Sequence, residues 1–209
     1  MVRASRDVIT PSTSTTSTFV AGVIVFVHSK APPFIFSGTV REMLIGNGYI
    51  NDVKKDDSPE AQLDTFIDKY SPEVAAIARA CLRKMRARLP GATQLVYDNY
   101  NALAIGFGSS EKASHAIFSI VLYPRWVSFF FLQGAGLDDP QQVLKGSGSV
   151  VRHIVLKSAA DLDQAAIQAL MAAALRSAVE PVNPKLPGGL IIRSISAKQR
   201  PRLPDSLEN

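Results

Sequence analysis

Cysteine is almost absent from this 209-residue sequence. The single Cys81 excludes an intramolecular disulfide, a CxxC redox pair and a zinc site built from several cysteines. A chain without disulfides is typical of a reducing compartment, so we expect a cytoplasmic location. Cys81 also falls in the apolar stripe of a predicted helix, which indicates a small buried residue rather than a nucleophile.

The sequence also lacks an apolar run long enough to cross a membrane. The run at 19–27 has nine residues, whereas a membrane-spanning helix needs about 20, so we predict no membrane span. Its length fits the centre of a signal peptide, and the Arg-bearing, acid-poor start resembles a transit peptide. A third interpretation is an upstream extension without a folded role, with Met43 as an alternative start. All three stay open, and we expect residues 1–55 to be poorly structured.

Positive charge is scarce in the central part of the chain, although the net charge is +5. Residues 1–55 carry +3, residues 56–180 carry −1 and residues 181–209 carry +3. A duplex-binding protein has a basic face over its fold, so we predict no specific DNA binding. The C-terminal tail at 201–209 and the cations just before it are expected to be flexible. Lys198, Arg200 and Arg202 would then give only weak, salt-dependent contact with nucleic acid or an acidic partner.

Histidine is rare as well, and no catalytic pattern accompanies it. The three histidines, His28, His115 and His153, form no HxH or HxxxH pair, which argues against a catalytic zinc site. The G-x-S-x-G pattern of a serine hydrolase is also absent. We therefore predict a protein that is not an enzyme.

Two helix-start signatures open the central part. Asp57-Ser58-Pro59-Glu60 combines a side-chain acceptor, a first-turn proline and an acid near the helix N-terminus, and Ser71-Pro72-Glu73 repeats the pattern. Apolar residues at spacings of three and four predict a helix after each signature. The first contains Leu63, Phe66, Ile67 and Tyr70, and the second contains Val74, Ile77, Ala78, Cys81, Leu82, Met85 and Leu89.

Short apolar runs replace helical spacing after Gly91. They predict strands at 103–107, 116–123, 126–132, 151–156 and 190–192, and their turns indicate antiparallel hairpins. Asp138-Asp139-Pro140 is expected to start a helical turn, and Asp163 to cap a helix that ends at Pro181. The order predicts an α+β fold over residues 56–200, with helices packed on one face of an antiparallel sheet.

Carboxylates on the first predicted helix form a candidate metal site. Glu60, Asp64 and Asp68 are four residues apart and therefore share one row. Oxygen ligands of this kind suit hard cations such as Mg²⁺ or iron. The alternative is a solvated helix face, and the row of Arg79, Arg83 and Arg86 on the second helix has the same alternative.

A glycine-rich loop is the second candidate site. Glycines flanking a serine let backbone N–H groups converge on an anion, and nearby cations add charge. The candidate residues are Lys145, Gly146, Ser147, Gly148, Arg152 and His153. Because a strand rather than a helix N-terminus follows, the loop departs from a phosphate-binding loop. An ordinary connection is the alternative.

Four aromatic residues with polar handles fall at strand ends or turns: Tyr97, Tyr100, Tyr123 and Trp126. Such residues can line a pocket or close an edge of the core. We expect them to close the core.

Several segments resemble the YdhG-like family, a domain family of largely unknown function. The resemblance runs from about Asp57 to Pro201, and many relatives carry Lys or Asn where this chain has Ser149. The segments are Ser71-Pro-Glu-Val-Ala, Asp98-Asn-Tyr-Asn-Ala-Leu-Ala-Ile-Gly-Phe-Gly, Leu122-Tyr-Pro-Arg-Trp-Val, Phe131-Leu-Gln-Gly-Ala-Gly-Leu, Leu144-Lys-Gly-Ser-Gly, Arg152-His-Ile and Ile195-Ser-Ala-Lys-Gln-Arg-Pro-Arg.

The resemblance implies a two-layer α+β fold similar in shape to frataxin. One branch of the family is described as an iron chaperone for iron–sulfur cluster and haem assembly. By analogy, Glu60, Asp64 and Asp68 would bind iron, and assembly proteins would be the partners. The sequence thus predicts a non-enzymatic binding protein that handles iron. The alternative is a module that binds a small anion or phosphometabolite through Lys145, Gly146, Gly148 and Arg152.

Overall fold

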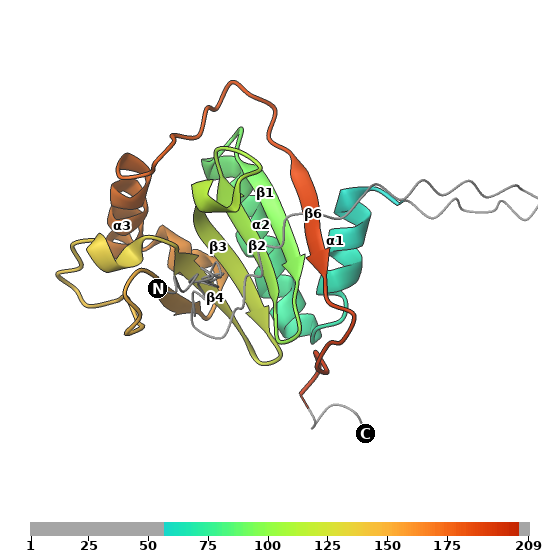
Figure 1. Cartoon of the computed structure of the whole chain (residues 1–209). Helices are drawn as coiled ribbons and strands as arrows, with labels where there is room; N and C mark the ends of the chain where they lie inside the picture. Colours follow the sequence, from blue (N-terminus) through green and yellow to red (C-terminus); the bar gives the residue numbers. More distant parts are fainter. Residues whose placement is uncertain (1–56, 205–209) are drawn as a thin grey trace, which may run out of the picture.

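The computed structural model describes residues 57–204 (Figure 1). The expectations for residues 1–55 and for the last five residues of the tail lie outside this part of the chain. Within it, no helix is both long and apolar enough to cross a membrane.

Both helix-start signatures are confirmed. The Ser58 hydroxyl accepts a hydrogen bond from the Ala61 amide, and the Ser71 hydroxyl accepts one from Val74. A proline occupies the first turn of each helix, where its missing N–H costs no hydrogen bond. The two helices are α1, Pro59–Ile67, and α2, Pro72–Arg88.

The sheet has six strands in the order β5-β4-β3-β2-β1-β6. The neighbours from β1 to β5 are antiparallel, as the hairpin pattern predicts. A strand from residue 93, which the sequence did not separate from its surroundings, precedes them. The bounds are β1 Thr93–Asp98, β2 Leu103–Gly108, β3 Ala116–Tyr123, β4 Trp126–Phe131, β5 Arg152–Leu156 and β6 Leu190–Ile195.

Strand β6 pairs with β1 in parallel, so the sheet is mixed rather than purely antiparallel. The chain reaches β6 from α3 (Ala165–Arg176) through a long connection that passes over one end of the sheet (Figure 1). β6 therefore starts beside the start of β1, where the Gln94 amide donates to the Gly189 carbonyl at 2.6 Å.

The structure changes the roles predicted for two acids, Asp163 as a helix cap and Asp139 as the start of a helical turn. Asp163 ends a 3₁₀ turn (η3, Ala159–Asp163), and Gln164 is the N-cap of α3 without a side-chain bond. The Asp163 carboxylate instead pairs with Lys84 and Arg88 on α2. Because Asp163 directly precedes a helical stretch, the sequence pattern alone could not distinguish an N-cap from an ion-pair partner of α2. Asp139 starts a single turn, in which its carbonyl accepts from the Gln142 amide at 3.0 Å, but no helix follows. Its carboxylate accepts from the amides of Val143 and Leu144 in the loop.

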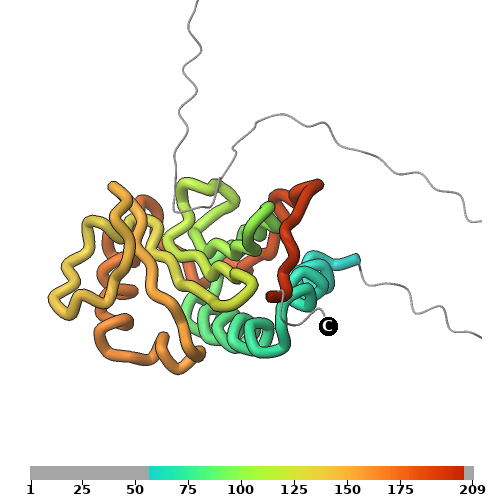
Figure 2. Tube along the Cα trace, turned by 90° about the horizontal axis from the view of Figure 1, so that it is seen from below, coloured from blue at the N-terminus to red at the C-terminus, as the bar shows by residue number. Residues whose placement is uncertain are grey.

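The core lies between the sheet and the helices. Figure 2 shows α1 and α2 on one side of the strands, as the sequence predicts. Cys81 and Met85 of α2 are fully buried there with Phe118 and Phe129 of the sheet, whose rings stack at 5.3 Å. Burial raises the pKa of the Cys81 thiol to about 11, which keeps it protonated at neutral pH. Its predicted place in the core is confirmed.

Candidate functional site

The sheet face opposite the helices carries its own apolar cluster, which we call the open face. Side chains alternate across each strand, and the pairing places Leu95, Gly106, Ser119, Phe130 and His153 in one row across five strands. The neighbouring row contains Tyr97, Ala104, Val121 and Ser128. Ala104, Val121 and Phe130 are buried in this second cluster, separate from the main core.

A cavity of about 260 Å³ lies on the open face. It forms because the middle of the first row is small: Gly106 and Ser119 stand between the larger Leu95 and Phe130. A Cβ added to Gly106 would come no closer than 3.7 Å to its neighbours, so the space above this glycine is open. The remaining wall is mostly apolar and includes Tyr97, Ala104, Ala113, Ala116, Val121, Leu132, Val150 and Val151.

Few polar groups reach this cavity. Asn99, Ser119 and Gln133 are the polar side chains of the wall apart from the Tyr97 phenol. The Nδ2 atom of Asn99 is buried and has no hydrogen-bond partner within residues 57–204. A buried amide donor without a partner costs free energy. An acceptor brought by a ligand, with a small rotation of the amide, would remove that cost.

The glycine-rich loop forms one rim of the cavity through Val150 and Val151. Its backbone is held by paired hydrogen bonds between Lys145 and His153, and Gly146 has a φ of 113°, which favours glycine. Arg152 donates to the carbonyls of Gly148 and Val151. The guanidinium therefore supports the loop itself. Anion binding by these residues stays a prediction.

His153 is the β5 residue of the first row of the open face, and its backbone pairs with Lys145 of the loop. Its ring stacks on Phe130 with centroids 5.0 Å apart. Burial, and then the charge of Lys145, lower the pKa of the imidazole below its usual value. A neutral ring is thus favoured, which suits stacking on Phe130 more than a charged anion receptor.

The structure pairs the predicted acidic row with the predicted basic row. Asp68 contacts Arg79 at 2.7 Å, and Asp64 contacts the same guanidinium at 3.4 Å. Glu60 contacts Arg86 at 2.9 Å. Within residues 57–204 no group of three or more His, Cys, Asp or Glu side chains is arranged to hold a metal ion. Iron binding by the three acids stays a prediction, and a metal would have to compete with the arginines.

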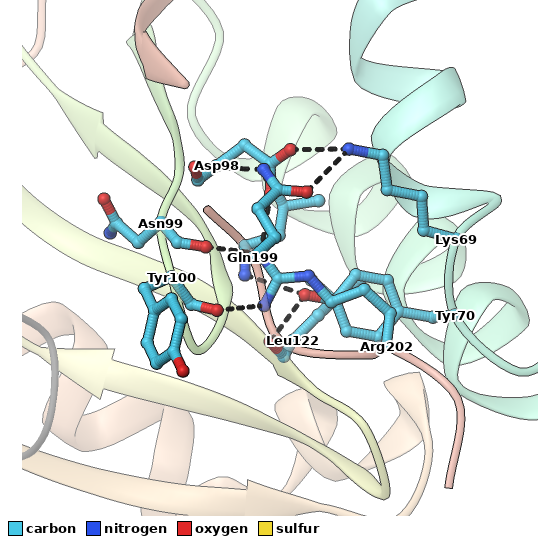
Figure 3. A network of polar contacts seen from close by, with 9 residues as sticks. Lys69, Tyr70, Asp98, Asn99, Tyr100, Leu122, Gln199 and Arg202 are labelled. Atoms are coloured by element: carbon cyan, nitrogen blue, oxygen red, sulfur yellow. Dashed lines mark hydrogen bonds and ion pairs between the residues drawn. The ribbon is translucent and has the colours of Figure 1, made fainter. Parts of the chain in front are cut away.

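A buried charge network fixes the C-terminal segment (Figure 3). Arg202 donates to Asp98 at 2.9 Å, and both side chains are at most 4% exposed. Lys69 contacts the other carboxylate oxygen at 2.8 Å, and the Arg202 guanidinium lies 5.5 Å from the Tyr70 ring centroid. The expectation that Arg202 belongs to a flexible tail is wrong, because this guanidinium is the buried partner of Asp98.

Tyr70 belongs to the same network (Figure 3). Its hydroxyl donates to the Leu122 carbonyl and accepts from the Leu103 amide. Burial is the main reason why its pKa is raised, so the phenol stays neutral and joins the turn between α1 and α2 to the sheet.

No protein-family model, curated protein or solved structure matches the chain. The YdhG-like resemblance therefore remains a prediction from the quoted segments. What the structure itself establishes is an α+β fold with a mixed six-stranded sheet.

Sequence reasoning missed the cavity and misjudged the aromatic residues. The small residues Ala104 and Gly106 alternate with larger ones in β2, but only the register shows that Ser119 continues the hollow across β3. Tyr100 is 51% exposed and Trp126 is 44% exposed, so the expectation that they close the core is wrong for these two. Tyr100 lies in the turn after β1 and Trp126 is the first residue of β4, so both side chains are at one end of the sheet and reach solvent.

Proposed function

We propose that this is a non-enzymatic binding protein for a small apolar molecule with one hydrogen-bond acceptor. The observation that carries the proposal is the cavity of about 260 Å³ on the open face, with its mostly apolar wall. Pockets for drug-sized ligands measure roughly 300–1,000 Å³ and are mainly apolar, with a few polar groups that orient the ligand. This cavity is slightly smaller, which limits the ligand to a small molecule.

The polar groups set the chemistry of the ligand. Asn99 offers a buried amide donor that lacks a partner within residues 57–204, and Ser119 and Gln133 add hydroxyl and amide groups. Within the part of the chain that the structure describes, no charged side chain lines the cavity. A carbonyl, hydroxyl or amide group on an aliphatic or aromatic body therefore fits better than a phosphate.

The test is a thermal-shift series on the full chain with benzene, phenol, hexanol and hexanamide. A ligand at 100 times its Kd adds about 2.7 kcal/mol of stability. We expect hexanamide and phenol to raise the melting temperature more than benzene does. No shift with any of the four probes would contradict the proposal.

Two variants locate the binding event. Gly106→Val fills the open space above β2, where a Cβ meets no close neighbour, and should abolish the shift. Val155→Leu is the matched control, because Val155 is an exposed residue of β5 that does not line the cavity. A shift that survives Gly106→Val in a folded protein would place the ligand elsewhere.

Iron binding, which the YdhG-like resemblance implies, is tested separately by titrating the full chain with Fe²⁺. Glu60, Asp64 and Asp68 each contact an arginine, so we expect anaerobic Fe²⁺ to give no saturable binding. Saturable binding that disappears when all three acids are changed to Ala would favour iron delivery. Iron–sulfur or haem assembly proteins would then be the partners to seek in the cytoplasm.

A further inference from the structure

A second hollow, the terminal cleft, lies at the β3–β4 end of the sheet. It has a volume of about 450 Å³ and lies between the hairpin turn and the C-terminal segment. Its lining includes Tyr123, Arg125, Trp126 and Arg200. It is separate from the cavity of the proposed function, because the two share no lining residue.

An exposed aromatic platform forms one wall of the terminal cleft. Tyr123 and Trp126 are directly opposite each other across the hairpin, and their rings stack at 5.0 Å with 28° between the planes. Trp126 keeps 44% of its surface exposed. The tyrosine orients the indole, and solvent reaches the rest of it. Such a ring can stack with a further planar group.

Two arginines supply the charge. Arg125 occupies the hairpin turn beside Trp126, and Arg200 lies across the cleft in the C-terminal segment; both are exposed. The Arg200 amide donates to the Tyr100 carbonyl at 2.9 Å, and the buried Arg202 holds the same segment two residues later. Among residues 57–204, none of those that line the cleft is acidic. The cleft therefore presents fixed positive charge beside a planar aromatic surface.

We propose that the terminal cleft binds single-stranded nucleic acid, with one unpaired base on Trp126 and flanking phosphates near Arg125 and Arg200. Aromatic rings and backbone-tracking cations are the shared means by which proteins hold single strands without reading sequence. A base within a duplex is already stacked on both faces and cannot use the platform. The inference agrees with the absence of a broad basic face for duplex DNA.

Trp126 is the only tryptophan of the chain, so intrinsic tryptophan fluorescence reports on this site directly. The experiment titrates the full chain with oligothymidylate of about 12 nucleotides, a length that one single-strand-binding domain can cover. We expect saturable quenching by the single strand and much weaker quenching by a duplex of equal length. Equal quenching by both would overturn the proposal.

Variants separate stacking from charge. Trp126→Leu should weaken strand binding by about fivefold or more, measured by anisotropy of a labelled strand, because a stacked base is lost. Changing Arg125 and Arg200 together to Ala should lower the log–log salt slope by about 1.4, which is about 0.7 per phosphate contact. The matched control changes the exposed Lys112 and Lys185, which do not line the cleft, to Ala.

Two further probes identify the ligand. Polyglutamate tests for simple polyanion binding, and thymidine monophosphate tests for a free nucleotide. We expect neither to reach the affinity of the strand. Equal binding of polyglutamate, equal binding of the mononucleotide, or a Trp126→Leu protein that is folded and binds the strand unchanged would each refute the assignment. Thermal unfolding of every variant confirms that it is folded.

Discussion

Two glycines of β2, two residues apart, have opposite surroundings. A Cβ at Gly106 would lie 3.7 Å or more from other atoms, whereas a Cβ at Gly108 would lie 2.5 Å from the His115 carbonyl oxygen. Gly106 therefore keeps the cavity open, and Gly108 lets the chain of β3 approach β2. The same residue type has a different role at each position.

We predict opposite effects of alanine at these two positions. Gly106→Ala should stabilise the protein by about 0.5–1 kcal/mol, because alanine restricts the unfolded chain and fits the strand. Gly108→Ala should destabilise it by about 1–3 kcal/mol, since the new methyl group overpacks against backbone. Urea unfolding of both variants measures the difference, and a Gly108→Ala protein as stable as Gly106→Ala would contradict it.

His153 makes the free energy of unfolding depend on pH. Its pKa in the folded protein is lowered by burial and by Lys145, so folding favours the neutral ring. The resulting stability is fully present above the unfolded value of about 6.5 and is lost as the pH falls through the lower folded pKa.

We predict that His153→Phe reduces this loss. A phenyl ring can keep the stack on Phe130 and takes up no proton. Urea unfolding between pH 7 and pH 5 should therefore show a smaller decline in the free energy of unfolding for the variant than for the unchanged protein. Lys145→Met should reduce the decline in part, because it removes the second cause. Equal slopes for His153→Phe and the unchanged protein would exclude the histidine as their source.

At the scale of elements, a buried charge network holds the C-terminal segment against the end of β1. Asp98 ends β1 with its carboxylate 1% exposed, and Arg202 brings the segment after β6 back onto it. Without Arg202, the buried Asp98 carboxylate keeps only the partly exposed Lys69 as a charged partner among residues 57–204, and breaking a buried pair by removing one side is strongly destabilising.

We therefore predict that Arg202→Met lowers the free energy of unfolding by about 3–5 kcal/mol. Arg200→Met, the exposed neighbour two residues away, should change it by no more than about 0.5 kcal/mol. Combining Arg202→Met with Asp98→Asn should recover part of the loss, because the buried carboxylate that has lost its arginine is then neutral. Urea unfolding measures all three variants. Similar free energies of unfolding for the two single variants would refute the stabilising role of the buried Arg202–Asp98 pair.

The helices α1 and α2 show how tertiary pairing changes the meaning of a charge pattern. The sequence shows each row, and a solvated helix face explains either one taken alone. Only the packing of one helix beside the other brings Asp68 within 2.7 Å of Arg79. Exposed pairs of this kind contribute at most about 1 kcal/mol each, so the rows orient the helices more than they stabilise them.

At the scale of the whole molecule, local signals predicted the elements and missed the long-range contacts. Ser58 and Ser71 predict where their helices begin, because an N-cap side chain bonds to an amide within three residues. Arg202 is 104 residues from Asp98, and no spacing rule reaches that far. The cavity was missed for the same reason, since it depends on register between Gly106 and Ser119. The parallel pairing of β6 depends on where a long connection arrives.

Both proposed sites use the open face, and neither uses the helices. The cavity occupies its middle, and the terminal cleft begins at its Tyr123–Trp126 end. The helix side carries the main core and the paired rows of charge. The molecule thus separates the layer that stabilises the fold from the surface that is available for binding.

The parallel partnership of β6 with β1 has a consequence for the order of folding. The hairpins from β1 to β4 close over short loops, whereas residues 99–189 separate β1 from its partner β6. Loop closure costs more entropy as the intervening segment lengthens, and distant contacts slow folding. We therefore expect β6 to be the last strand to join the sheet. Until it does, the edge of β1 stays unpaired and can accept the same strand from another molecule.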